Sequence, residues 1–176
     1  MPSLKYNDEI IIESSIVAQF LADAHASHLA PTSNAPGGAL ARARMAFFAD
    51  TWSTKVQPVM FSMFRAPESA EEKATEVAAA INKEIDPLLK DAKPYFGGSD
   101  KVTMAEVMTA SFVIRLYAYA RAGLFPKSLI GQLDAIPNFS KWAKTLMQTE
   151  SVIYIWDEQK NIEGIKGKIE QARKTH

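Results

Sequence analysis

The sequence contains no cysteine among its 176 residues. Without thiols, the chain cannot form a disulfide framework, bind a metal through thiolates or supply a thiol nucleophile. It also lacks an excess of charge, because 20 lysine and arginine residues balance 20 aspartate and glutamate residues. A neutral chain gains little long-range attraction to nucleic acid or to an anionic membrane, so neither is an expected partner.

Long apolar runs and familiar catalytic motifs are missing as well. No stretch approaches the roughly 20 apolar residues of a membrane-spanning helix, and the polar start lacks the apolar core of a secretory signal. We therefore expect a soluble, cytoplasmic protein. The sequence has no G-x-S-x-G, no glycine-rich phosphate loop and no H-E-x-x-H. His25 and His28 have no cluster of acidic residues nearby in the sequence, so we expect surface histidines and no metal site.

What is present predicts a mainly α-helical fold that begins with a short β-hairpin. Leu4 and the run Ile10–Ile12 flank an Asn-Asp turn, which favours a hairpin. Two short strands are marginal in water, so this hairpin must pack on helices or on another chain. Apolar residues then recur at helical spacing, which predicts a first helix with Ser14 as its N-cap and Ala24 near its end.

A long amphipathic helix is predicted over about residues 40 to 64, where apolar residues repeat every three or four positions. Pro58 should bend this helix near Thr54 and Lys55, because proline removes a backbone donor and clashes with the preceding turn. A further helix is predicted after Ser69, with two glutamates near its positive end. The polar stretch 161–176 is expected to form a charged, partly frayed tail.

Thr103 and Glu106 form the strongest local signal in the sequence, a capping box. A hydroxyl at the N-cap and a carboxylate three residues later can each satisfy a backbone amide that the helix leaves free. The residues that follow are apolar around most of the helix circumference. A helix of this kind belongs in the centre of a bundle.

Glu13 and Ser14 are the candidate functional residues. At the junction of a strand and a helix they present a carboxylate, a hydroxyl and free backbone amides, which suit the zwitterionic head group of an amino acid. The alternative is a simple helix cap without a ligand, since serine is common at helix starts. Both interpretations remain open on the residues alone.

The order and spacing of these features resemble the glutathione transferase family, and its omega-like and related fungal members most. The segment from Pro2 through Glu13 and Ser14 to Leu21 is similar to the end of the thioredoxin-like domain of that family. The resemblance implies a fragment of this domain at 1–26 and the family's all-helical C-terminal domain at 38–160. The family usually has aspartate at the position of Glu106.

The resemblance also implies a ligand and its binding residues. In the family, the residues that match Pro2, Glu13 and Ser14 bind glutathione, Pro2 as a cis-proline, and Met1 would pair with it through its backbone. Arg115, Phe48 and Trp156 are the residues that we expect in the acceptor pocket. Glutathione is a substrate in this family, and no catalytic residue of this chain matches the family's nucleophile.

Two functions are therefore expected from the resemblance. The first is thiol transfer or glutathione conjugation. Relative to the family the chain is N-terminally truncated, so we expect it to be inactive or only weakly active by itself. The second is a non-catalytic helical module for protein–protein interaction. In either case we expect a homodimer that forms through the first helix and the long helix, because their apolar faces would otherwise stay uncovered.

Overall fold

The computed structural model describes residues 3–25 and 27–174. It begins with an antiparallel hairpin of β1 (Ser3–Tyr6) and β2 (Glu9–Ile12), in which Leu4 lies opposite Ile11. Helix α1 (Ser14–Ala24) follows directly. The hairpin and the extent of the first helix are confirmed. The helices of the remaining bundle are α2 (Gly38–Thr51), α3 (Gln57–Arg65), α4 (Ala70–Ala80), α5 (Met104–Arg121), α6 (Ser128–Asp134), α7 (Pro137–Leu146), α8 (Glu150–Ile153) and α9 (Glu158–Lys174).

The predicted bend before Pro58 takes the form of a π-helical turn, Trp52–Val56, between α2 and α3. The Gln57 amide donates to the Trp52 carbonyl five residues earlier, which makes room for a ring that an α-helical turn would not accept. A second π-helical turn, Ile81–Ile85, stands in the same relation to Pro87. There the chain continues as a short 3-10 helix, Asp86–Leu89, and further 3-10 turns lie at Pro67–Ser69 and Phe96–Gly98.

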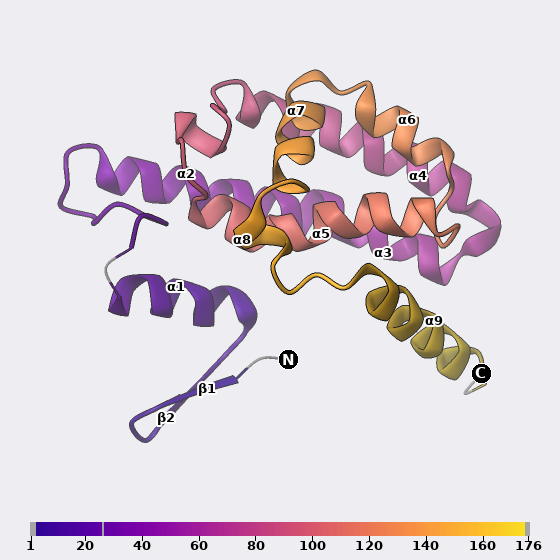
Figure 1. Cartoon of the computed structure of the whole chain (residues 1–176), viewed down its shortest axis with the longest axis horizontal. Helices are drawn as coiled ribbons and strands as arrows, with labels where there is room; N and C mark the ends of the chain where they lie inside the picture. The colour runs from indigo at the N-terminus through magenta and orange to yellow at the C-terminus, as the bar shows by residue number, and fades with distance from the viewer. Residues whose placement is uncertain (1–2, 26, 175–176) are drawn as a thin grey trace.

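Helix α5 is the central buried helix, as the sequence predicts. Its side chains at Val113, Leu116, Ala118 and Ala120 are fully buried, and it packs on α2, α6 and α7. The helices surround it in Figure 1, which shows α1 and the hairpin apart from them on one side.

The capping box at the start of α5 is confirmed and has additional partners. The Ala105 amide donates to the Thr103 hydroxyl at 3.2 Å, and the Thr103 amide donates to Glu106 Oε2 at 2.8 Å. Glu106 is fully buried, and its other oxygen accepts from the Phe96 amide and from Trp142 Nε1, each at 2.8 Å. The carboxylate thus joins α5 to α7 and to the turn before α5.

Two local expectations are corrected by the structure. Ser14 is the first residue of α1 and not its N-cap; Glu13 stands at the cap position, and no side chain caps the helix. The stretch 161–176, expected as a frayed tail, forms most of α9 as far as Lys174. Ile162 and Ile165 pack against the core, and these contacts explain why the polar segment is helical.

Helix α1 is held mainly by the hairpin. The Tyr6 and Phe20 rings meet edge to face with their centroids 5.0 Å apart, yet none of the α1 side chains is buried. Within the part of the chain that the structure describes, no helix is long and apolar enough to cross a membrane.

Candidate functional site

The junction of β2 and α1 contains an unusual backbone conformation at Glu13. Its φ of 69° and ψ of 122° lie outside the ordinary regions for a residue with a side chain. Asn7 also has a positive φ, but asparagine tolerates this conformation in turns. A glutamate held in such a conformation costs about 1–3 kcal/mol, and strain of this kind is concentrated at functional sites.

The first turn of α1 is open to solvent. The first helical hydrogen bond runs from the Val17 amide to the Glu13 carbonyl at 2.9 Å, so the amides of Ser14, Ser15 and Ile16 have no acceptor within the helix. These residues are exposed, and no side chain caps the helix. The positive end of the helix therefore faces solvent beside the Glu13 carboxylate, an arrangement that can bind a carboxylate and an amino group together.

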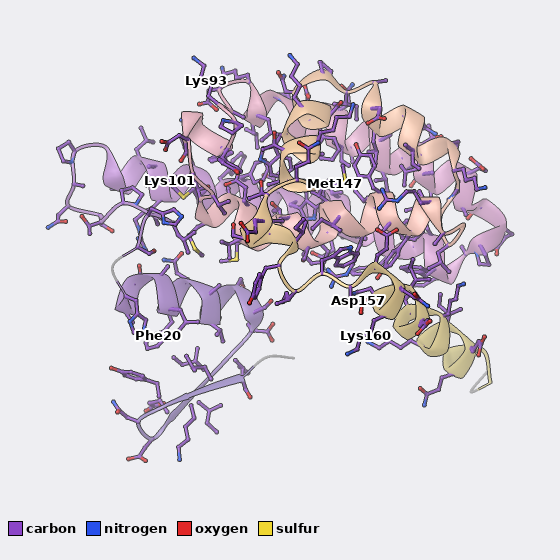
Figure 2. All side chains as sticks on the ribbon, viewed as in Figure 1. Phe20, Lys93, Lys101, Met147, Asp157 and Lys160 are labelled. Carbon is purple, nitrogen blue, oxygen red and sulfur yellow. The ribbon has the colours of Figure 1, made fainter. Side chains whose placement is uncertain are left out.

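A cavity of about 680 Å³ adjoins this helix start, because Ser14 and Ser15 line it. It lies between α1, the α2–α3 segment and α5. Its volume falls within the usual range for small-molecule sites. Its apolar wall is formed by Ile16, Phe20, Met45, Met104, Met108 and Phe112, and Figure 2 shows Phe20 on α1. Polar side chains at Gln19, Asp23, Arg42, Asp50, Ser53 and Gln57 complete the lining.

One ion pair lies in this cavity wall, between Arg42 of α2 and Asp23 of α1. Gln19 donates to the second Asp23 oxygen at 3.0 Å, and Arg42 Nη1 donates to the Pro31 carbonyl at 3.2 Å. The hydrogen bond from Gln19, followed by the contact with Arg42, lowers the pKa of the Asp23 carboxyl below its usual value. Asp23 therefore stays charged at neutral pH.

Arg115 and Trp156, two residues expected in the acceptor pocket, contact each other. The Arg115 guanidinium lies 5.8 Å from the Trp156 ring centroid and 5.9 Å from that of Phe112, and Phe112 lines the cavity. Among the described residues no carboxylate forms an ion pair with Arg115, whose Nη1 donates to the Ser111 carbonyl. Arg115 and Trp156 do not line the cavity themselves; Arg115 contacts Phe112, which does.

Phe48 does not join this group. It is fully buried, with its ring centroid 4.8 Å from that of Phe96 and 5.5 Å from that of Trp142. Its position on α2 faces the bundle interior, whereas Met45 and Ala49 line the cavity. We therefore assign Phe48 to the core and not to an acceptor pocket.

The other residues singled out by the sequence add no further site. Met1 and Pro2 lie outside the described residues. His25 and His28 are exposed, and within residues 3–25 and 27–174 no three potential ligands of the His, Asp or Glu type converge.

Sequence reasoning missed the cavity and the Arg42–Asp23 pair. The spacing of Met104, Met108 and Phe112, each four residues apart, does indicate one face of α5. It could not show that this face borders a cavity, because a core-facing stripe has the same spacing.

The comparisons with known proteins concern the fold. No family model matches the chain, and no curated protein matches it. A solved structure does match, that of glutathione transferase Omega 3C from Trametes versicolor, with a TM-score of 0.73 and 19% sequence identity. The match covers 99% of this chain and 71% of that chain. The chain therefore has a glutathione-transferase fold, namely the mainly α-helical C-terminal domain of these proteins preceded by a small β-hairpin.

Proposed function

We propose that the chain is a glutathione transferase-like protein that binds glutathione at the junction of β2 and α1. The observation that carries this proposal is the strained Glu13 beside an uncapped, exposed helix start. The amide and hydroxyl of Ser14 would bind the γ-glutamyl carboxylate, and the Glu13 carboxylate would bind the amino group. From the family resemblance we keep Met1 and Pro2 as further contacts to glutathione.

The chemistry of the proposed function is thiol transfer or conjugation, with glutathione as the source of sulfur. The similarity to a glutathione transferase supports glutathione as the substrate in this proposal. An acceptor would lie beside α5, where Met104, Met108 and Phe112 line the cavity and Arg115 contacts Phe112. These 176 residues contain no cysteine and no assigned group that lowers the pKa of a bound thiol, so we expect little or no turnover from them alone.

Binding can be tested by isothermal titration calorimetry with glutathione, S-methylglutathione and the dipeptide Cys-Gly. We expect the first two to bind alike and Cys-Gly not to bind, because the site holds the γ-glutamyl end. Glu13→Gln should weaken binding by roughly tenfold, since it removes a charge-assisted hydrogen bond.

The matched control is Glu9→Gln, which removes an equal charge from an exposed position of β2. This variant should bind glutathione as the unaltered protein does. The proposed site would be contradicted if Cys-Gly bound as tightly as glutathione. It would also be contradicted if Glu13→Gln and Glu9→Gln weakened glutathione binding equally.

We also propose that the protein is a cytoplasmic homodimer that forms through α1 and α2. The resemblance implies both properties, and reduced glutathione is abundant in the cytosol. Leu40 and Phe47 support the dimer, because these large apolar side chains lie on one face of α2 and are 67% and 60% exposed.

The second candidate function, a non-catalytic interaction module, is favoured by the exposed apolar surface around the hairpin. Ile10 and Ile12 alternate on the hairpin face opposite Leu4 and Tyr6, and both are exposed. Surface of this kind suits a protein partner. Analytical sedimentation that shows a clean monomer, with no binding of an apolar dye, would contradict this function.

A further inference from the structure

The position of the proposed glutathione site depends on how α1 is held against the bundle. None of the α1 side chains is buried, and the cavity separates much of the helix from α2 and α5. Figure 1 shows α1 and the hairpin as a unit beside the bundle. Val17, Ala18, Gln19, Phe20 and Ala22 are only half-buried, so packing holds α1 less firmly than the bundle helices and its polar contacts have greater weight.

Arg42 of α2 makes the polar side-chain contact to α1. Among the described residues, its ion pair with Asp23 is the one side-chain hydrogen bond or ion pair found between α1 and the two bundle helices across the cavity, α2 and α5. The same guanidinium donates to the Pro31 carbonyl, in the segment that connects α1 to α2. Arg42 therefore contacts both α1 and its connection to α2, and the Met104 amide also ties this connection to α5 by donating to the Leu29 carbonyl at 2.8 Å.

Both partners of the Arg42–Asp23 ion pair make a further hydrogen bond. Gln19, one turn earlier on α1, occupies the second carboxylate oxygen. Arg42 in turn uses both terminal nitrogens, one for Asp23 and one for Pro31. Shared donors and acceptors of this kind restrict the rotation of the two side chains more than a single exposed ion pair does.

We propose that Arg42 is a positioning residue, which through Asp23 holds α1 and its N-terminal residues Glu13 and Ser14 in place beside the cavity. This inference rests on the proposed function for its effect on glutathione. The placement of α1 by Arg42 does not depend on the proposed function. Loss of the ion pair leaves Glu13 and Ser14 chemically intact but lets the helix that carries them move relative to Met104 and Met108.

The placement of α1 can be measured without glutathione. Because the chain has no cysteine, Asp8→Cys in the hairpin turn and Lys141→Cys on α7 provide two unique positions for spin labels. Pulsed electron resonance should give a narrow distance distribution, and Arg42→Gln should broaden it. The exchanged pair Asp23→Arg with Arg42→Asp should narrow the distribution again in part, because it restores opposite charges but not the contacts to Gln19 and Pro31.

Arg44→Gln is the matched control. Arg44 lies on the same helix and pairs with Asp91 at 2.6 Å, without a contact to α1. It should leave the distance distribution unchanged. An unchanged distribution in Arg42→Gln, or equal broadening in the control, would overturn the proposal.

A calorimetric titration then links placement to binding. Arg42→Gln should weaken glutathione binding by roughly fivefold, and the exchanged pair should recover part of this loss. If the unaltered protein binds no glutathione, the proposed function fails while the distance measurement still decides the role of Arg42. If the unaltered protein and Arg42→Gln bind glutathione with equal affinity, the role of Arg42 in positioning the glutathione site is refuted.

Discussion

Glu106 shows how one side chain can serve both a helix and the packing around it. A capping box requires only the contact to Thr103. The glutamate also accepts from the Phe96 amide and from Trp142 Nε1, and both donors are buried. The aspartate usual in the resembling family has one methylene fewer, so the longer side chain matters for these two distant contacts.

At the scale of the residue, we predict that Glu106→Asp lowers the free energy of unfolding by about 2–6 kcal/mol. The shorter side chain can still cap α5, but it leaves two buried donors without an acceptor, each at a cost of about 1–3 kcal/mol. Urea denaturation followed by tryptophan fluorescence measures the change. The control Glu163→Asp, on the exposed side of α9, should change stability by less than about 0.5 kcal/mol. A Glu106→Asp protein as stable as the control would show that the two added contacts are not needed.

At the scale of the element, the two prolines inside helical segments show a common solution. Pro58 and Pro87 each follow a π-helical turn. Helix periodicity predicted the first segment correctly because the side chains on either side of the turn still face the core. It could not distinguish a kink from a π-helical turn, because both satisfy the same apolar spacing.

Replacing two helical glycines by alanine should change the stability of the protein in opposite directions. A Cβ at Gly38, the first residue of α2, would lie 2.0 Å from the Thr32 carbonyl oxygen, whereas one at Gly131 in α6 would meet nothing within 4 Å. We predict that Gly38→Ala destabilises the protein by more than about 1 kcal/mol through this clash. Gly131→Ala should stabilise it by about 0.5–1 kcal/mol, because alanine favours the helix. Thermal unfolding by circular dichroism tests both, and a loss of stability at Gly131 would contradict the helical argument.

At the scale of the whole molecule, the bundle and the α1–hairpin unit differ in how they are stabilised. The bundle has a continuous core around α5, whereas α1 buries none of its side chains. Large apolar side chains remain exposed on α1 and α2. The proposed homodimer would cover them.

For this assembly we predict that Phe47→Glu converts a dimer into a monomer, because it places a charge in the centre of an apolar contact. Sedimentation velocity measures the change. Tyr154→Glu is the control, since Tyr154 is also highly exposed but lies just after α8, away from α1 and α2 in the sequence. A monomeric unaltered protein, or dissociation in both variants, would count against an interface on α2.

The sequence by itself determined the features that depend on neighbouring residues. The hairpin follows from its turn and flanking apolar runs, α1 from its helical spacing, and the start of α5 from Thr103 and Glu106. These are short-range effects of backbone geometry and capping, so they can be read from a single chain.

Only the tertiary structure decided which faces meet across long distances. It placed Phe48 in the core and Met45 on the cavity wall, although both belong to the same apolar helix. It also brought Arg42 to Asp23 and Trp142 to Glu106. Helical periodicity shows that a side chain is apolar and where it recurs, but the packing of distant segments determines whether it meets the core, a cavity or solvent.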